Sequence, residues 1–193
     1  MSELVFLLEE PSMKVLLDDL LPRFYPDLSF RCIPHEGKQD LERSVPRMLR
    51  AWKVPGARFV IVRDKDQEDC VKLKSRLTEL CHEGRRPDSL VRIVCRELEA
   101  WYFGDCEALA EAYGDDQLRA LGGRERYRDP DAIVRPSFEL AKQVPEFQKR
   151  SGARRMAATM HRNRNTSHSF RVFFEGVERL AGDGSINSGQ EGT

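Results

Sequence analysis

The sequence lacks several features that mark large classes of proteins. Its apolar runs fall well short of the roughly 20 residues that a membrane-spanning helix requires. The start of the chain has neither the basic region nor the apolar core of a signal peptide. The five cysteines are scattered, without the Cys-x-x-Cys or Cys/His spacing of a zinc site. Gly-x-Gly-x-x-Gly, Walker A and Gly-x-Ser-x-Gly motifs are also absent. We therefore expect a cytoplasmic protein without membrane association, whose cysteines stay reduced.

Charge of one sign is not in excess. The 193 residues include 32 basic and 32 acidic side chains, so the formal net charge is zero and no global field attracts the protein to nucleic acid or membrane. The length is sufficient for one domain with a proper hydrophobic core. We expect an α/β core over 1–113, a helical C-terminal extension over 114–181 that packs on it, and a disordered tail over 182–193, rich in Gly, Ser, Asn and Gln.

Short apolar runs alternate with amphipathic stretches along the first half of the chain. The runs predict strands at 4–8, 28–33, 59–62 and 90–95. The amphipathic stretches predict helices at 11–21, 40–52, 67–82 and 98–113, with a last helix at 170–180. Pro22 and Pro26 should end the first helix, and Pro46 should kink or break the second. This alternation predicts about four mainly parallel strands sandwiched by helices, followed by short helices over 114–165.

Acidic residues follow three of the four predicted strands. They are Glu9 and Glu10, Asp64 and Asp66, and Glu97 and Glu99. Because the carboxyl ends of parallel strands share one edge of the sheet, these side chains are expected to converge there. Two like charges about 4 Å apart cost on the order of 4 kcal/mol at an effective dielectric constant near 20, so such a group needs a proton, a basic neighbour or a cation.

The chemistry of the acidic residues favours a hard cation. Oxygen ligands point to Mg²⁺ or Mn²⁺, and an ion held by carboxylates is the usual apparatus of phosphoryl chemistry. A second interpretation stays open, because acidic residues after strands are often solvated or cap the next helix, as Asp66 would.

Basic residues are concentrated in one segment. Between Phe147 and Phe174 there is no acidic residue, and Arg154, Arg162 and Arg164 are candidates for phosphate contacts. Lys38 follows the second strand and is a further candidate at the same sheet edge. The alternative is a solvated helix face with ordinary ion pairs. Aromatic residues are sparse in this segment, so the sequence does not indicate a stacking platform for single strands.

Several segments resemble a bacterial family of domains of unknown function, number 4276, which is grouped with Toprim-like proteins. They are 7–12, 37–41, 64–66, 96–101 and 165–170. A glutamate after the first strand, Asp-x-Asp after the third and a later acid also resemble the Toprim pattern. That pattern is the metal-binding fold of topoisomerases, primases and the overcoming-lysogenization-defect nucleases.

The resemblance implies roles for individual residues. Glu9, or its neighbour Glu10, would be the general acid/base, and Asp64 and Asp66 would hold Mg²⁺, with Glu97 or Glu99 completing the metal site. The implied function is a nuclease in phage defence that works with an ATPase partner. Toprim proteins usually carry glycine after the first glutamate, where this chain has Glu10. That departure keeps open a non-catalytic interaction or sensor subunit, and a small-molecule phosphohydrolase is the other alternative.

Overall fold

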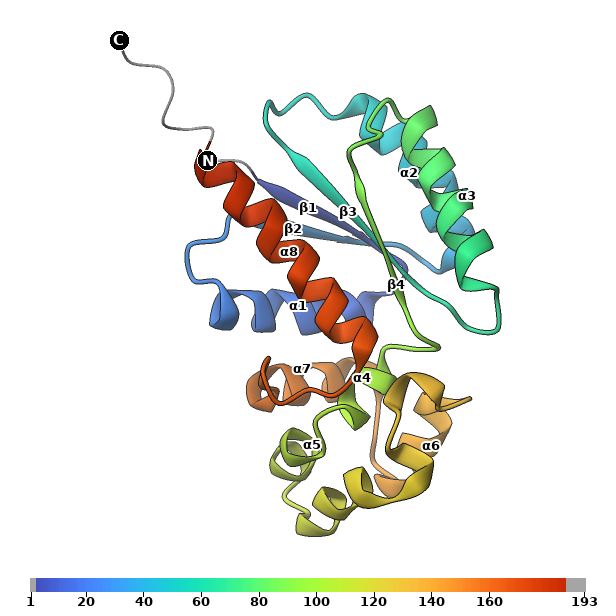
Figure 1. The fold of residues 1–193 in the computed structure, drawn as a ribbon, viewed down its shortest axis with the longest axis vertical. Helices are drawn as coiled ribbons and strands as arrows, with labels where there is room; N and C mark the ends of the chain where they lie inside the picture. The colour runs from blue at the N-terminus through green and yellow to red at the C-terminus, as the bar shows by residue number, and fades with distance from the viewer. Residues whose placement is uncertain (1–2, 187–193) are drawn as a thin grey trace.

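The computed structural model describes residues 3–186, and its centre is one sheet of four parallel strands (Figure 1). The strands are β1 (Leu4–Leu8), β2 (Phe30–Pro34), β3 (Arg58–Asp64) and β4 (Leu90–Val94), in the order β2-β1-β3-β4. The central strands β1 and β3 are almost entirely buried, as expected for continuous apolar runs covered on both faces. The predicted α/β class and its parallel sheet are therefore confirmed.

Helices cover both faces of the sheet (Figure 1). Helices α2 (Lys38–Ala51) and α3 (Cys70–Glu83) lie on one face, and α1 (Pro11–Phe24) and α8 (His168–Ile186) on the other. Alternation along β1 turns Val5 and Leu7 toward α2 and α3, whereas Leu4 and Phe6 enter the opposite core. The ring of Phe6 there lies 6.1 Å from that of Phe173 on α8.

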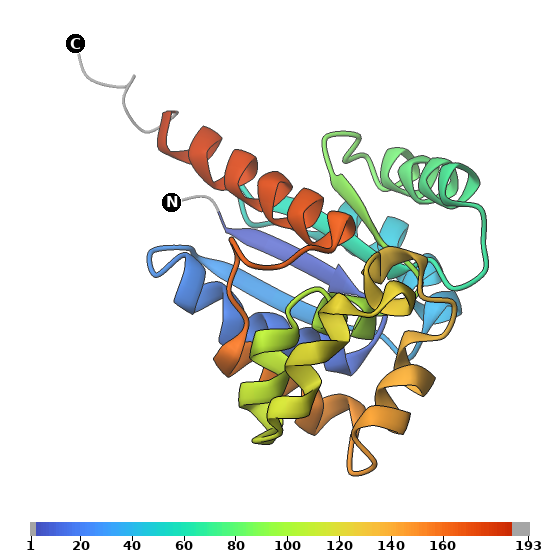
Figure 2. The ribbon, with the colours of Figure 1, turned by 60° about the horizontal axis from the view of Figure 1, so that its bottom comes forward.

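The remaining helices gather at the carboxyl end of the sheet (Figures 1 and 2). They are α4 (Glu99–Phe103), α5 (Cys106–Tyr113), α6 (Pro136–Gln143) and α7 (Lys149–Thr159), with 3-10 turns η1 (Asp116–Gly123), η2 (Glu125–Tyr127) and η3 (Pro130–Ala132). Their buried side chains join α1, α8 and one sheet face in a single hydrophobic cluster. The segment after residue 113 thus shares the core of the sheet, and its last helix is one of the layers.

Several helices differ from the predictions in their boundaries or continuity. Helix α1 continues through Pro22 to Phe24, and α2 contains Pro46 within one continuous helix, so each proline removes one hydrogen bond of the ladder without ending its helix. The helix predicted over 98–113 is divided, since Asp105 caps α5 by accepting a hydrogen bond from the Ala108 N–H at 3.1 Å. Helix α8 runs to Ile186, past the predicted end, and positions 187–193 of the predicted tail lie outside the described residues.

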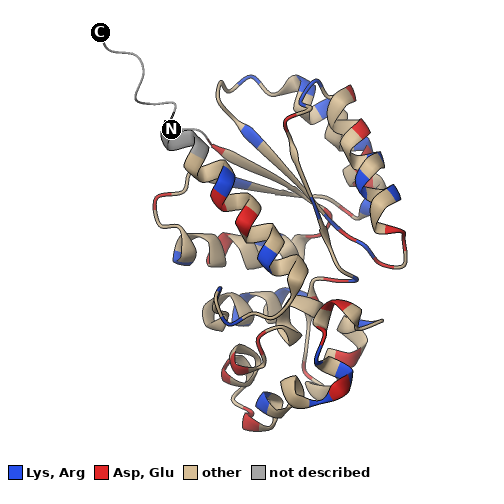
Figure 3. Cartoon of the chain, in the orientation of Figure 1, with Lys and Arg blue, Asp and Glu red and all other residues tan. Residues whose placement is uncertain are grey.

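The surface of the described chain carries both signs of charge on most helices (Figure 3). In residues 3–186 we find no helix with the length and hydropathy needed to traverse a bilayer.

Gly104, between α4 and α5, should tolerate no side chain. A Cβ there would lie 3.0 Å from the backbone nitrogen of Ser167 and would overlap Oδ1 of Asn165, whose amide donates to the Trp101 carbonyl at 2.8 Å. We expect Gly104→Ala to lower the free energy of unfolding by about 2 kcal/mol. Gly123→Ala, at a position with nothing within 4 Å, should stay within about 0.5 kcal/mol of wild type. Urea denaturation measures both, and equal values for the two variants would contradict the packing argument.

Candidate functional site at the carboxyl edge of the sheet

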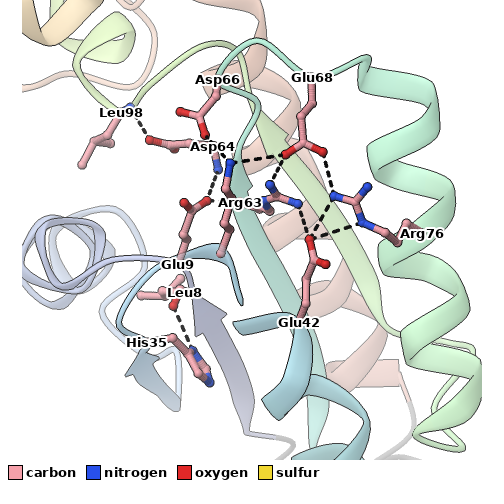
Figure 4. A network of polar contacts seen from close by, with 11 residues as sticks. Leu8, Glu9, His35, Glu42, Arg63, Asp64, Asp66, Glu68, Arg76 and Leu98 are labelled. Carbon is pink, nitrogen blue, oxygen red and sulfur yellow. Dashed lines mark hydrogen bonds and ion pairs between the residues drawn. The ribbon is translucent and has the colours of Figure 1, made fainter. Parts of the chain in front are cut away.

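Two of the predicted acidic residues fasten neighbouring strand ends together (Figure 4). Glu9, directly after β1, accepts a hydrogen bond on Oε2 from the Asp64 N–H at 3.1 Å. Asp64, the last residue of β3, accepts one on Oδ2 from the Leu98 N–H at 3.2 Å. The carboxylates that follow β1 and β3 therefore each bind the backbone of the next segment along the edge, which fixes their positions.

A buried arginine lies behind Glu9. Arg63 precedes Asp64 on β3 and is 1% exposed, and its guanidinium pairs with Glu42 of α2 and with Glu68 (Figure 4). Arg76 of α3 bonds the same two carboxylates, at 3.0 Å and 2.7 Å. We call these four residues the arginine ring. The remaining nitrogen, Nε of Arg63, lies 3.6 Å from Glu9 Oε2 and has no hydrogen-bond partner in the described chain, so its charge acts on Glu9.

Glu10 faces a lysine from the C-terminal helices. Lys149, the first residue of α7, places Nζ 2.8 Å from Glu10 Oε2, and the Ser12 hydroxyl donates to the other oxygen. Burial alone would lower the pKa of Lys149, but the charges of Glu99, Glu10 and Asp64 outweigh it and raise that pKa. A cation at the amino end of a helix opposes the helix dipole, so the attraction of the carboxylates must offset that cost.

Glu99 is the least compensated acid at this edge. It is the first residue of α4 and 1% exposed, and neither carboxylate oxygen has a hydrogen-bond partner among the described residues. Burial raises its pKa to about 7, against the attraction of Lys149. The Tyr102 hydroxyl on the same helix is likewise buried without a partner in this part of the chain, and burial, followed by the Glu99 charge, raises its pKa.

The acids at this edge are coupled electrostatically. Burial raises the pKa of Glu9 to about 7, although the Arg63 charge and the hydrogen bond from Asp64 oppose the shift. Burial also raises the pKa of Asp64, and the charges of Glu10, Glu9 and Glu99 add to it. We call Glu9, Glu10, Asp64 and Glu99 the carboxylate cluster. Near neutral pH the cluster holds protons that isolated carboxylates would have released.

The other predicted acids lie at the margin of the cluster. Asp66 adopts a left-handed conformation (φ 51°), which ends the alternation of β3, and its carboxylate lies 4.0 Å from Nζ of Lys38. The Asp66 charge nonetheless contributes to the raised pKa of Glu9. Glu97 Oε2 accepts a hydrogen bond from the Ser137 N–H at the start of α6, at 2.8 Å. Of the pair after β4, Glu97 is therefore engaged by backbone and Glu99 is free of hydrogen bonds in the described chain.

Two of the three predicted phosphate-binding arginines are paired with carboxylates outside the cluster. Arg162 pairs with Glu178 of α8, and Arg164 lies 2.5 Å from the Asp105 carboxylate. Arg154 is exposed on α7, the helix that also carries Lys149. Besides Arg63, two lysines reach the acidic edge. Lys149 lies 2.8 Å from Glu10, and Lys38 lies 4.0 Å from Asp66.

The donors of the cluster have the chemistry that a hard divalent cation prefers, and the orphaned, buried Glu99 oxygens fit such an ion. No ready cage is formed, however: within residues 3–186 no three His, Cys, Asp or Glu side chains are grouped so as to hold a metal. Asp64 and Glu9 instead bond backbone N–H groups. A cation would have to replace protons on the cluster and draw the carboxylates together.

Two residues of this site were missed at the level of sequence. Arg63 interrupts an apolar strand directly before Asp64, and an arginine at a position buried on both faces is itself a signal of a buried ion-pair network. Lys149 belongs to the acid-free segment, but nothing in its spacing distinguishes it from the other basic residues there. Its contact with Glu10 depends on how α7 packs against α1.

Removing Arg63 should destabilise the protein far more than removing Arg76. Arg63→Met leaves Glu42, Glu68 and Glu9 without the buried cation between them, and we expect a loss of about 3 kcal/mol in unfolding free energy. Arg76, with 42% of its side chain exposed, should cost about 1 kcal/mol or less as Arg76→Met. Urea denaturation of the two variants at one pH measures the difference. Equal losses would contradict the claim that the buried Arg63 contributes more to stability than the exposed Arg76.

Stability should fall as the pH rises from about 4.5 to 7. Glu9 and Glu99 keep their protons in the folded state up to about pH 7, whereas the ordinary glutamate value is 4.5, so the folded state binds more protons across this window. Glu99→Gln removes one such group and should be more stable than wild type at pH 7.5, by about 2 kcal/mol. Urea denaturation at pH 5 and 7.5 in EDTA tests this, with the exposed Glu83→Gln as control. An unchanged pH dependence in Glu99→Gln would refute the assignment.

Comparison with known proteins places the chain by family. The family described as domain of unknown function (DUF4276) matches residues 8–178, a span that includes strands β2, β3 and β4, the carboxylate cluster and most of α8. Neither the curated proteins nor the solved structures gave a match. Because the match covers most of the length of the chain, the protein belongs to the DUF4276 family of domains of unknown function.

Proposed function

We propose that the protein hydrolyses nucleic-acid phosphodiesters with Mg²⁺ or Mn²⁺ at the carboxylate cluster. One observation carries the proposal: the charges of Glu9, Glu10 and Glu99 all act on the buried Asp64 at the carboxyl edge of a parallel sheet, and Glu99 is buried with no hydrogen-bond partner in the described chain. Ligand sites of open α/β sheets lie at this edge. The cost of crowding the acids is offset by protons at neutral pH, and a divalent cation would offset it better.

The metal would be held by Asp64 and Asp66, with Glu10 and Glu99 as further oxygen ligands. Glu97 is less suited, because its carboxylate already binds the Ser137 N–H. A bound Mg²⁺ supplies a water of lowered pKa and neutralises charge on the phosphate. This ligand set extends the Toprim likeness, in which Asp-x-Asp holds the ion.

Glu9 is the proposed general acid/base. Its pKa of about 7 allows it to accept and return a proton near neutral pH, where such catalysis is most efficient. The Asp64 N–H and the Arg63 guanidinium hold the Oε2 atom from two directions, so the carboxylate is positioned before substrate arrives. Arg63 thus acts as a positioning residue for Glu9.

Cations beside the cluster would receive the substrate phosphate. Lys149 lies next to Glu10, and Lys38 lies 4.0 Å from both Asp66 and Glu68. These positions favour the two lysines over Arg162 and Arg164, which are engaged by Glu178 and Asp105. Arg154 is exposed on the helix of Lys149 and is a candidate for contacts farther along a strand.

An ATPase partner and a role in phage defence are the biological part of the proposal. They are supported by the resemblance to the overcoming-lysogenization-defect nucleases. The sequence has no nucleotide-binding loop of its own, so a step driven by ATP would need a separate ATPase.

A non-catalytic interaction or sensor subunit is the second candidate. It is favoured by the hydrogen bonds in which Glu9 and Asp64 accept from backbone N–H groups, since these give both carboxylates a structural role at the strand ends. The two candidates differ in whether the protein binds Mg²⁺ or Mn²⁺ and cleaves nucleic acid with it.

Isothermal calorimetry with Mg²⁺ and Mn²⁺ tests the metal site. Wild type should bind with release of protons, and Asp64→Asn/Asp66→Asn should lose the binding, because the amides carry no charge to attract the ion. Asp88→Asn, at an exposed turn, is the matched control and should bind as wild type does. Metal binding that survives the double substitution would place the ion elsewhere.

Cleavage assays with labelled single- and double-stranded DNA and RNA test the chemistry. Glu9→Gln should retain metal binding but lose about 10²- to 10⁴-fold in kcat/KM, the usual effect of removing a general acid/base. If wild type binds the metal and cleaves none of these polymers, the sensor candidate takes precedence.

A further inference from the structure

A hollow of about 370 Å³ lies beside α6, away from the arginine ring. It is lined by the turn after η3, by the first turns of α6 and by one residue of η2. The residues used below are Arg126, Val134, Arg135, Phe138, Glu139 and Lys142. Figure 2 shows α6 in the group of helices at the carboxyl end of the sheet. The proposed chemistry of the cluster makes no use of this hollow.

The hollow presents apolar surface to solvent. Val134 is 64% exposed and Phe138 46% exposed, and they are two of the four large hydrophobic side chains exposed in the region whose side chains are described. The Arg135 guanidinium lies 4.7 Å from the centroid of the Phe138 ring, and Nζ of Lys142 lies 4.3 Å from it. An exposed aromatic ring with two cations beside it suits a ligand that joins a flat π-system to negative charge.

The charge of the hollow is positive. Glu139, its one carboxylate, has only 6% of its side chain exposed and is paired with Arg126 at 2.5 Å and with Lys142 at 3.1 Å. Arg135 has no share in that pairing and contacts the Phe138 ring. One buried carboxylate against three cations therefore leaves an excess of positive charge around the ring.

These features together match an unpaired nucleotide. A base offers a π-face for Phe138, and the adjoining phosphates offer charge for the arginines and the lysine. In a duplex the base faces are stacked on one another, so the ring has no access to them.

The hollow is joined to the carboxylate cluster through α6. Ser137, the neighbour of Phe138, donates its N–H to Glu97 at 2.8 Å, and Glu97 lies two residues before Glu99 of the cluster. The geometry points to this hollow as the place where unpaired nucleotides of the substrate bind, with the strand continuing to the carboxylate cluster. The continuation of the strand to the carboxylate cluster rests on the proposed function, whereas the binding of nucleotides in the hollow does not.

Fluorescence anisotropy in EDTA measures the binding without any chemistry. The probes are a labelled single-stranded DNA of about 20 nucleotides, the RNA of the same sequence, and the corresponding DNA duplex. We expect wild type to bind the single strands more tightly than the duplex. Phe138→Ala should weaken single-strand binding about tenfold, and Phe138→Trp should restore it, because stacking needs only a π-face. Val71→Ala, which truncates an exposed valine on α3, is the control and should change nothing.

The cations are tested by their salt dependence. Arg135→Gln/Lys142→Gln should weaken binding and reduce the slope of log affinity against log salt by about 1.4, which is the share of two phosphate contacts on a single strand. Arg47→Gln/Lys72→Gln removes the same charge from exposed positions on α2 and α3 and should leave the slope unchanged. Equal slopes for the two double variants, unimpaired binding by Phe138→Ala, or preference for the duplex would each overturn the inference.

The outcome separates this inference from the proposed hydrolysis. If single strands bind through Phe138 in EDTA but are not cut when Mg²⁺ is added, the hydrolase proposal fails and the binding site stands. If Phe138→Ala cleaves single strands with unchanged KM, the hydrolase stands and the hollow is not its substrate site.

Discussion

The repulsion among carboxylates at the carboxyl edge of the sheet is the constraint to which the rest of the structure responds. Strands β1 and β3 are adjacent, and parallel pairing places the acids that follow them side by side. Glu99 then enters from the segment after β4, so that charges from three strand ends meet in a buried region. Like charges about 4 Å apart cost on the order of 4 kcal/mol at an effective dielectric constant near 20 unless something compensates them, and the neighbouring elements supply such compensation.

The compensation comes from two directions. From the α2 and α3 face, Arg63 brings a buried guanidinium that satisfies Glu42 and Glu68 and extends its charge to Glu9. From the C-terminal helices, α7 packs on α1 and supplies Lys149 to Glu10. The C-terminal half is therefore joined to the sheet by this ion pair as well as by a continuous hydrophobic core. Without those helices, one face of the sheet would lose apolar contacts and Glu10 would lose its ion pair with Lys149.

Much of this arrangement was accessible from the sequence, and the reasons for the rest are physical. Apolar runs followed by acids predicted the strands, their parallel pairing and the edge at which Glu9 and Asp64 meet, because these depend on periodicity and topology alone. The contact of Lys149 with Glu10 depends on packing between elements 139 positions apart, which no local pattern encodes. The break before Asp105 had a local signal that the prediction missed, since Gly104 is followed by an aspartate that caps the next helix. A hydrophobic residue such as Phe138 would ordinarily be assigned to the core, whereas here it is exposed.

The surroundings of the buried Glu99 differ from those of the buried Glu139. Where this chain buries a carboxylate for structural purposes it surrounds it with cations, as Arg126 and Lys142 do for Glu139. Glu99 is buried more deeply, yet it has no hydrogen-bond partner in the described chain and only the more distant attraction of Lys149. With its pKa raised to about 7, Glu99 still holds a proton in about half of the molecules at pH 7, and a bound cation would compete with that proton. A purely structural role would have been served better by an amide or a nearby arginine, so the uncompensated burial of Glu99 is the feature on which the proposed cation site rests.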